Sequence, residues 1–235
     1  MYYGYGYGFD WTYILLIIGV VISGIASMKV NSTFKKYAKI GSTSGMTGAE
    51  AAQKILYSEG IMDVRIQHVA GNLTDHYNPA TKTVNLSDAT YASSSVAAVG
   101  VAAHECGHVI QHHRGYAPLN IRTALVPVAN IGSRAGIPII LIGMFLGANQ
   151  ALINLGILVF SFGVLFQIVT LPVEFDASAR ALRLVGTLGI LNPDEVKDTR
   201  KVLKAAAMTY VASAFAAMLS LLRLLILFGG NRRRN

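Results

Sequence analysis

The chain has little of what a secreted or a water-soluble globular protein normally contains. Its 235 residues include a single cysteine, Cys106, so no intrachain disulfide can form. Only 14% of the residues are charged, whereas 53% are hydrophobic. The mean hydropathy is positive, which is unusual for a water-soluble globule. This composition indicates a membrane protein.

The N-terminal segment also lacks the features of a signal peptide. It starts with MYYGYGYGFDW, which contains no basic residue and carries Asp10, and no small-residue cleavage pattern follows the apolar run. We therefore expect a retained transmembrane helix whose aromatic start lies at the headgroup level. A disordered tail is the alternative for residues 1–8.

Three apolar stretches are long enough to cross a bilayer, which requires about 20 residues. They cover residues 11–28, 151–173 and 205–228. A fourth, within residues 121–149, spans only if its apolar part 135–148 is extended upstream past Arg134 and Pro127. The sequence therefore predicts a mainly α, multi-pass membrane protein.

The distribution of basic residues orients the predicted spans. Half of the twenty Lys and Arg residues lie between residues 29 and 134, and another group lies between 180 and 204. By the positive-inside rule, both segments are cytoplasmic and the N-terminus is outside. The tail NRRRN disagrees with four strict crossings, so either residues 205–228 form a re-entrant or interfacial helix, or the rule is broken there.

The net charge of +8 is explained by basic residues that lie next to anionic membrane lipid. No nucleic-acid-binding module is present, and we expect no nucleic-acid partner.

Residues 41–120 form the part of the chain with the most soluble character. The segment 43–61 predicts a helix with Thr47 as its N-cap, Glu50 three residues later and Gly60 at its end. Residues 64–70 alternate like a strand, and residues 76–87 predict a strand, an Asn-Pro turn and a second strand. A turn and one long helix follow. We expect a small α+β unit that leads into a histidine-rich helix.

That helix carries the sequence HECGH, residues 104–108, which is an H-E-x-x-H motif. His104 and His108 are four residues apart and therefore share one helix face, where they can bind the same ion. Glu105 lies about 100° around the helix, beside the ion, where it can take a proton from an activated water molecule. This arrangement indicates a catalytic zinc ion. The alternative is a polar helix face near the membrane.

A catalytic zinc ion requires a third protein ligand. His112 continues the same face, but it lies two turns from His104, about 12 Å along the axis, and cannot join both histidines on one ion. His113 points off that face. The remaining candidates are Glu174, which we expect to open a helix directly after the span 151–173, and Asp176.

The segments HECGHVIQH and VEFDASARAL together resemble the bacterial YugP-like membrane zinc metallopeptidases. The resemblance extends through LTDHYNPATKTVNLS and RTALVPVANIGS and covers most of residues 45–210. More remotely, the chain is similar to the HtpX-type peptidases, in which a glutamate after a transmembrane helix is the third zinc ligand. The resemblance implies a zincin-like (gluzincin) unit with one Zn²⁺ held by His104, His108 and Glu174, and Glu105 as the catalytic base. The sequence departs from the HtpX-type pattern at Ser178, where an aspartate that supports a histidine ligand is expected; Asp176 is a candidate for that role.

Several other polar residues are candidates for supporting roles. The possible donors to the transition-state oxyanion are His76, Tyr77, His112 and Arg180. We expect Cys106 to pack away from the metal. Gly107 inside a helix indicates that another element packs closely there, and we expect this element to be the helix that begins at Glu174. Arg223 either snorkels to the interface or is an intramembrane functional charge.

The sequence as a whole predicts a zinc-dependent membrane endopeptidase in the inner membrane with its active site facing the cytoplasm. Its domains are spans at 11–28, 121–149 and 151–173, the unit 41–120, a cytosolic helical segment 174–204, and a transmembrane or re-entrant helix 205–228. Its partners are a peptide or protein substrate, which we expect to pair with an exposed edge of the strand 82–87, and the lipid bilayer. The alternatives are an inactive metal-binding scaffold and a small metal transporter. The sequence does not predict an oligomeric state.

Overall fold

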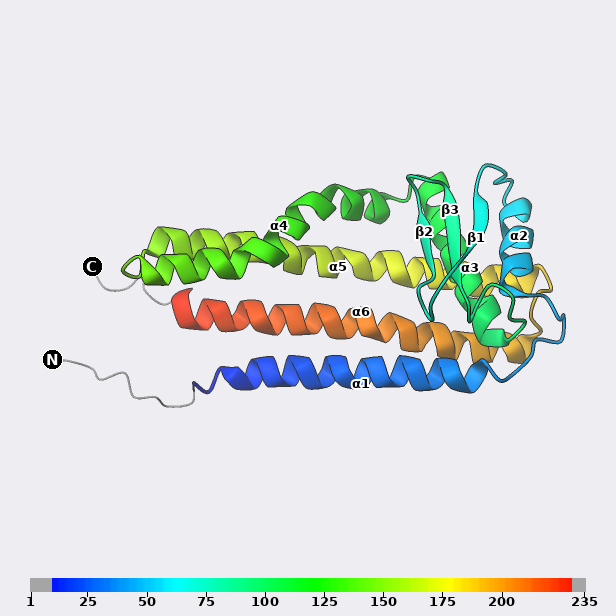
Figure 1. Cartoon of the computed structure of the whole chain (residues 1–235), viewed down its shortest axis with the longest axis horizontal. Coiled ribbons are helices and arrows are strands. Elements are labelled where there is room, and N and C mark those ends of the chain that lie inside the picture. The colour runs from blue at the N-terminus through cyan, green and yellow to red at the C-terminus, as the bar shows by residue number, and fades with distance from the viewer. Residues whose placement is uncertain (1–9, 230–235) are drawn as a thin grey trace. The chain divides into compact units, whose positions relative to one another are not determined.

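The computed structural model describes residues 10–229, which form six helices and one small sheet (Figure 1). The helices are α1 (Tyr13–Tyr37), α2 (Gly48–Ser58), α3 (Val96–His113), α4 (Ala117–Phe145), α5 (Gln150–Thr187) and α6 (Pro193–Phe228). The strands are β1 (Arg65–Val69), β2 (His76–Asn78) and β3 (Thr83–Ser87). The tyrosine- and glycine-rich start and the tail NRRRN, for which we made predictions, lie outside the described residues.

Four of the helices, α1, α4, α5 and α6, are long and apolar enough to cross a membrane. The fourth apolar stretch is extended upstream, because α4 continues through Pro127 and Arg134. The expected fold class, a mainly helical multi-pass membrane protein with a small α+β unit, is confirmed. The bounds of the membrane-crossing segments, and the zincin-like character of the small unit, remain predictions.

The prediction that Glu174 opens a helix is wrong. Helix α5 runs without a break through Pro172 and Glu174 to Thr187. Proline removes one backbone donor, and neighbouring helices in a membrane protein can compensate for that loss. As a result, one helix carries both a predicted span and a candidate metal ligand.

The chain divides into two compact units, and the first contains the described residues 10–25, 125–168 and 212–229. Small residues bring α4 and α5 into backbone contact, since a Cβ atom on Gly132 would lie 2.5 Å from the carbonyl oxygen of Val159. Such contacts are typical of helix packing in membranes. Arg223 lies 3.7 Å from the Asp10 carboxylate and donates a hydrogen bond to Thr12 Oγ1. Its charge is therefore paired within this unit.

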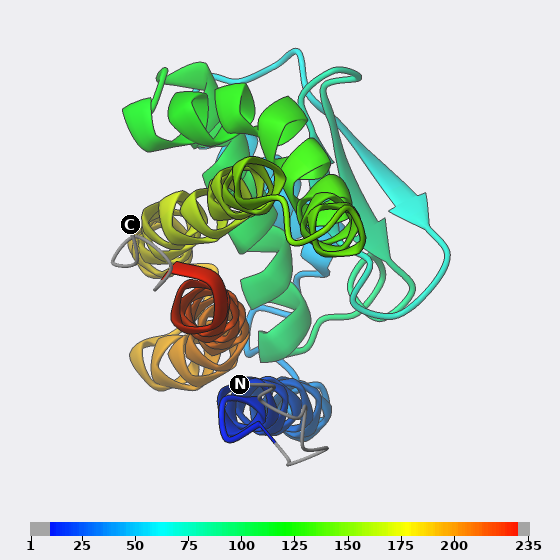
Figure 2. The same cartoon turned by 90° about the vertical axis from the view of Figure 1, so that its left-hand side faces the viewer.

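The second unit contains residues 26–124 and 169–211 and includes the sheet. The strand order is β1-β3-β2, with β3 parallel to β1 and antiparallel to β2. Figure 2 shows the strands beside α3. The expectation that strand 82–87 offers an exposed edge to a substrate is wrong, because β3 is the central strand and all five of its residues are buried. The edge strands are β1 and β2.

Helix α2 has the predicted cap. The side chain of Thr47 accepts a hydrogen bond from the backbone N–H of Glu50, and the Glu50 carboxylate accepts one from the backbone N–H of Thr47. This reciprocal pair satisfies backbone donors that the first helical turn leaves free. Gly60 follows the helix with φ +72°, a conformation that glycine adopts without strain.

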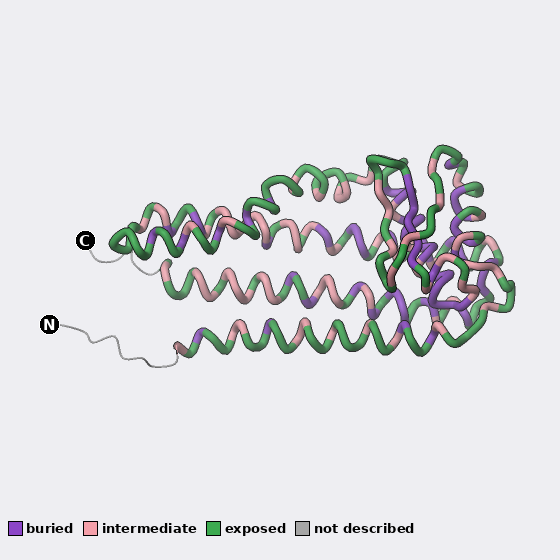
Figure 3. The backbone as a smooth tube through the Cα atoms, in the orientation of Figure 1, coloured by how far each residue is buried: buried purple, intermediate pink, exposed green. Residues whose placement is uncertain are grey.

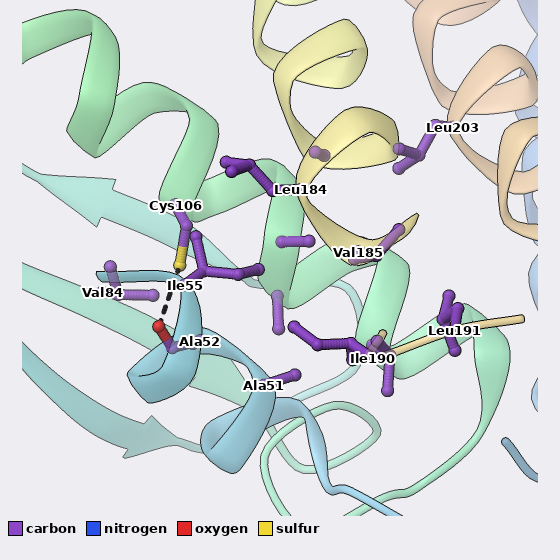
Figure 4. Packing of buried hydrophobic residues seen from close by; sticks show 14 of the residues in the cluster. Ala51, Ala52, Ile55, Val84, Cys106, Leu184, Val185, Ile190, Leu191 and Leu203 are labelled. Atoms are coloured by element: carbon purple, nitrogen blue, oxygen red, sulfur yellow. Dashed lines mark hydrogen bonds between the residues drawn. The ribbon is translucent and has the colours of Figure 1, made fainter. Parts of the chain in front are cut away.

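The core of the second unit lies between α2, the sheet, α3 and parts of α5 and α6. Buried residues follow β3 and most of α3 (Figure 3). Figure 4 shows Ile55 of α2 close to Cys106 of α3, and Val185 of α5 in the same cluster. This packing fixes one face of α3 and leaves the face with His104 and His108 only partly buried.

Candidate metal centre

Helix α3 carries the H-E-x-x-H motif and is held by close contacts with two other helices. It begins after Ser95, whose hydroxyl accepts a hydrogen bond from the backbone N–H of Ala98. A Cβ atom on Gly107 would lie 2.5 Å from the carbonyl oxygen of Ala177 in α5, and one on Gly100 would lie 2.5 Å from the Thr199 side chain in α6. The prediction that the helix with Glu174 packs closely against Gly107 is therefore confirmed. That helix is α5, which begins at Gln150 and not at Glu174.

Three side chains from α3 and α5 converge in a group that could hold a metal ion. Their ligand atoms, from His104, His108 and Glu174, all lie within 4.8 Å of one another. Glu174 Oε2 lies 3.3 Å from His104 Nε2 and 3.5 Å from His108 Nε2. The side chain of Glu174 is 3% exposed, and those of His104 and His108 are 15% and 13% exposed. The structure thus brings together the three residues that were predicted to be zinc ligands.

The two distances from Glu174 Oε2 to the histidine nitrogens agree with a four-coordinate zinc ion. Two ligand atoms bound tetrahedrally at about 2.0 to 2.1 Å are separated by about 3.3 to 3.4 Å. Moreover, Glu174 Oε2 is buried and makes no hydrogen bond within the described chain. An unsatisfied buried carboxylate oxygen is costly, and a bound cation would satisfy it. Two imidazoles and one carboxylate form a donor set typical of catalytic zinc sites.

The second nitrogen of each histidine is also engaged. His104 Nδ1 lies 3.1 Å from Ser178 Oγ, and His108 Nδ1 lies 3.0 Å from Gln111 Oε1. The amide nitrogen of Gln111 donates to the Val173 carbonyl oxygen, so its oxygen must accept the proton of His108 Nδ1. This contact leaves the lone pair of His108 Nε2 directed toward Glu174. Partners of this kind orient metal-binding histidines.

Asp176, the rival ligand, belongs to this supporting network. Its carboxylate accepts a hydrogen bond from the Gln111 amide at 2.8 Å and one from Arg180 Nε at 2.6 Å. Asp176 is not one of the three clustered residues, and its hydrogen bond with Gln111 connects it to the metal centre. Ser178, where the resemblance to HtpX-type peptidases implies an aspartate, contacts His104 through its hydroxyl group.

The electrostatics of the donor set depend on the negative charge of its carboxylates. Burial lowers the pKa of His108, but the adjacent Glu174 carboxylate and the charge of Glu105 raise it more strongly, so the net pKa is raised. A cation is therefore favoured beside Glu174.

A cavity of about 220 Å³ opens beside these residues. Its lining includes His104, Glu105, Glu174 and Ser178. Glu105 is 7% exposed and is not part of the three-residue group. It therefore faces the same cavity as the ligands without being one of them, as the helical spacing predicts for a general base.

Three residues at this site were not singled out from the sequence. Arg122 of α4 lies 3.8 Å from Glu174 Oε1, and Tyr210 of α6 lines the cavity and interacts with the Glu174 carboxylate. Neither has a local sequence signal, since each comes from a different helix. Gln111 does have one, because it lies three residues after His108 on the same helix face.

The four residues proposed as oxyanion donors do not line this cavity. His76 of β2 contacts Asn85, and Arg180 is paired with Asp176. Tyr77 and His112 pack ring to ring at 5.9 Å and line a separate cavity with His113.

Cys106 packs away from the metal centre, as expected. It is fully buried, and its sulfur contacts the carbonyl oxygen of Ala52 at 3.7 Å (Figure 4). Burial raises the pKa of the Cys106 thiol well above its ordinary value, which makes the thiol unreactive.

The sequence model of a family described as "Putative neutral zinc metallopeptidase" matches residues 12–229. The chain is also similar to "Putative membrane protease YugP" of Bacillus subtilis (strain 168), with 43% identity over 221 residues, which cover 94% of this chain and 98% of the relative. No solved structure matches the chain significantly.

Proposed function

The chain belongs to the family of neutral zinc metallopeptidases, and on that premise we propose that it is a zinc-dependent endopeptidase that cleaves peptide bonds near the inner membrane surface. The observation that carries the proposal is the convergence of His104, His108 and Glu174 beside a cavity whose lining also includes Glu105. One zinc ion held by these three residues would supply Lewis-acid chemistry, polarising a carbonyl group and acidifying water.

Glu105 is the general base and acid of the proposed reaction. Its carboxylate takes the proton of the attacking water and later passes that proton to the leaving amine nitrogen. This role is supported by its place in the cavity lining, outside the group of ligands. His104 and His108 keep fixed ring orientations through Ser178 and Gln111, so they do not compete for that proton.

Tyr210 is the donor to the oxygen of the substrate carbonyl. Three hydroxyl groups line the described cavity, those of Ser178, Thr209 and Tyr210. Ser178 contacts His104, and Thr209 donates to the carbonyl oxygen of Ala206. The Tyr210 hydroxyl interacts with the carboxylate of Glu174, the proposed zinc ligand, so it lies next to the place where negative charge develops on the carbonyl oxygen and can stabilise that charge.

The substrate binds in an extended form along β2. This strand pairs with β3 on one side only, and Asp75, which directly precedes it, lines the cavity. An edge strand offers backbone groups to a peptide of any sequence, while the cavity selects side chains. For β1, the other edge strand, neither the strand itself nor a residue directly flanking it contributes to the cavity lining.

The membrane surface is the proposed place of cleavage. The cavity is lined by residues that adjoin the ends of three predicted spans: Val30 follows 11–28, Glu174 follows 151–173, and Ala206 lies at the start of 205–228. The positive-inside rule assigns all three of these ends to the cytoplasmic side. Chains at or near the inner surface therefore have the shortest route to the cavity.

The proposal is tested with a Glu105→Gln variant of the full chain in detergent. We expect it to retain zinc like the wild type but to lose cleavage of an unfolded protein such as casein, because Glu105 acts on water and does not bind the metal. Loss of zinc would make Glu105 a ligand and refute the mechanism. Zinc-loaded wild type without any peptidase activity would favour the inactive scaffold.

A further inference from the structure

A second cavity of the same unit, of about 350 Å³, has a strongly basic lining. It is formed by α1 and α6, and no carboxylate lines it. Four of its eight lining residues are lysines: Lys29, Lys36, Lys201 and Lys204. The other four are Thr33, Tyr37, Ala205 and Met208.

The spacing of these residues places them on one face of each helix. Lys29, Thr33 and Lys36 are separated by four and three residues, and Lys201, Ala205 and Met208 by four and three. Lys36 and Lys201 meet at the Tyr37 ring, with their Nζ atoms 5.2 and 5.7 Å from its centroid. Residues 29–36 and residues 201–208 each extend about 10 Å along their helix, because an α-helix rises 1.5 Å per residue.

Most of this positive charge is not balanced by acidic side chains. Lys201 pairs with Asp198 at 2.8 Å, whereas the described residues include no carboxylate partner for Lys29, Lys36 or Lys204. Like charges gathered around one cavity repel one another, and an anion inside it would relieve this repulsion. The Thr33 hydroxyl adds a hydrogen-bond donor.

The cavity also has an apolar side at a level where lipid is expected. Lys29 directly follows the predicted span 11–28, and Lys204 directly precedes the predicted span 205–228. Ala205 and Met208 belong to that second span. The cavity thus combines ammonium groups next to the ends of two predicted spans with apolar side chains inside one of them.

We propose that this cavity binds an anionic phospholipid, with the lysines on its phosphate-bearing headgroup and Met208 against the start of an acyl chain. Basic pockets between transmembrane helices on the cytoplasmic side are suited to such headgroups. A free phosphate ion would use the lysines but not the apolar side. The lipid site is separate from the proposed peptidase centre and does not depend on catalysis.

The test measures phosphatidylglycerol binding to the full chain in detergent by native mass spectrometry, with phosphatidylcholine and inorganic phosphate as the other probes. The double variant Lys29→Gln/Lys204→Gln should bind phosphatidylglycerol at least about tenfold more weakly than wild type.

The matched control Lys35→Gln/Lys39→Gln removes two lysines of the same segment that do not line the cavity. Its affinity for phosphatidylglycerol should stay within about twofold of the wild-type affinity. The variant Lys29→Arg/Lys204→Arg, which keeps the charge, should retain binding, and zinc content reports that each variant is folded.

Three outcomes would overturn the proposal. Equal weakening in both glutamine variants would mean that the lysines attract anionic lipid only through diffuse charge. Equally tight binding of phosphatidylcholine would remove the need for a net negative headgroup. Displacement of phosphatidylglycerol by millimolar inorganic phosphate would identify the cavity as a site for free phosphate and not for lipid.

Discussion

The metal centre depends on single side chains that fix the direction of its ligands. Gln111 is fully buried, and its amide contacts His108, the Val173 carbonyl oxygen and Asp176. It therefore joins a ligand of α3 to the backbone of α5 next to Glu174, the ligand on that helix. Arg180 continues the same network through Asp176.

Replacing Gln111 should weaken zinc binding without abolishing it. In Gln111→Ala, the proton on His108 Nδ1 loses its acceptor. The Val173 carbonyl oxygen and the Asp176 carboxylate lose the amide group that donates to them. Zinc affinity should fall by about 10- to 100-fold, as is usual for partners of metal-binding histidines. Competition with a fluorescent chelator measures the affinity, and His112→Ala serves as a control on the same helix. Unchanged affinity in Gln111→Ala would mean that His108 is oriented by other contacts.

Removal of the Tyr210 hydroxyl should impair turnover and leave the metal in place. We expect Tyr210→Phe to lower kcat by about 10²- to 10³-fold, with little change in KM and full zinc content, as for the loss of an oxyanion donor. Tyr77→Phe removes a hydroxyl outside the cavity and should be nearly as active as wild type. Equal kcat values for both variants would exclude Tyr210 as the donor.

Individual helices of the second unit show which features follow from local sequence. The Thr47 cap and the face shared by His104 and His108 depend on neighbours within a few residues, so the sequence predicts them. The central place of β3 depends on which distant segments pair, and a strand pattern alone does not reveal this. The continuity of α5 through Pro172 is not predicted by local sequence either, because proline usually interrupts a helix and only contacts with distant segments can compensate for its missing donor.

Close packing of α3 against α5 should make Gly107 intolerant of any side chain. In Gly107→Ala, the new methyl group meets the backbone of Ala177 at 2.5 Å, and that backbone belongs to the helix with Glu174. Overpacking of this kind costs about 1 to 3 kcal/mol. The variant should unfold at a lower temperature than wild type and hold less zinc.

Gly100→Ala is the matched control in the same helix, because its methyl group meets a side-chain methyl of Thr199 and not a backbone atom. We expect a smaller loss of thermal stability and normal zinc content. A Gly107→Ala variant as stable and as zinc-loaded as Gly100→Ala would contradict the close contact with α5.

Over the whole molecule, the distribution of charge predicts the topology. The exposed Gln53 on α2 and Arg200 on α6 belong to segments assigned to the cytoplasm, whereas Leu146, between α4 and α5, belongs to the outer side. Cys106 is buried with a raised thiol pKa, so it need not be removed before new cysteines are introduced.

Labelling of intact cells with a membrane-impermeant maleimide checks this topology. Leu146→Cys should react from outside, and Gln53→Cys and Arg200→Cys should react only after the membrane is permeabilised. The wild type should remain unlabelled in both conditions. Reaction of Gln53→Cys in intact cells would place the metal centre on the outer side and overturn the cytoplasmic orientation.

The central claim is that His104, His108 and Glu174 hold one zinc ion, and the zinc content of purified variants tests it most directly. Plasma mass spectrometry should find about one zinc per chain in wild type and in Asp176→Ala, and almost none in folded Glu174→Ala, since losing one of three ligands weakens binding far more than losing a supporting residue. Zinc-loaded Glu174→Ala beside zinc-free Asp176→Ala would contradict the assignment.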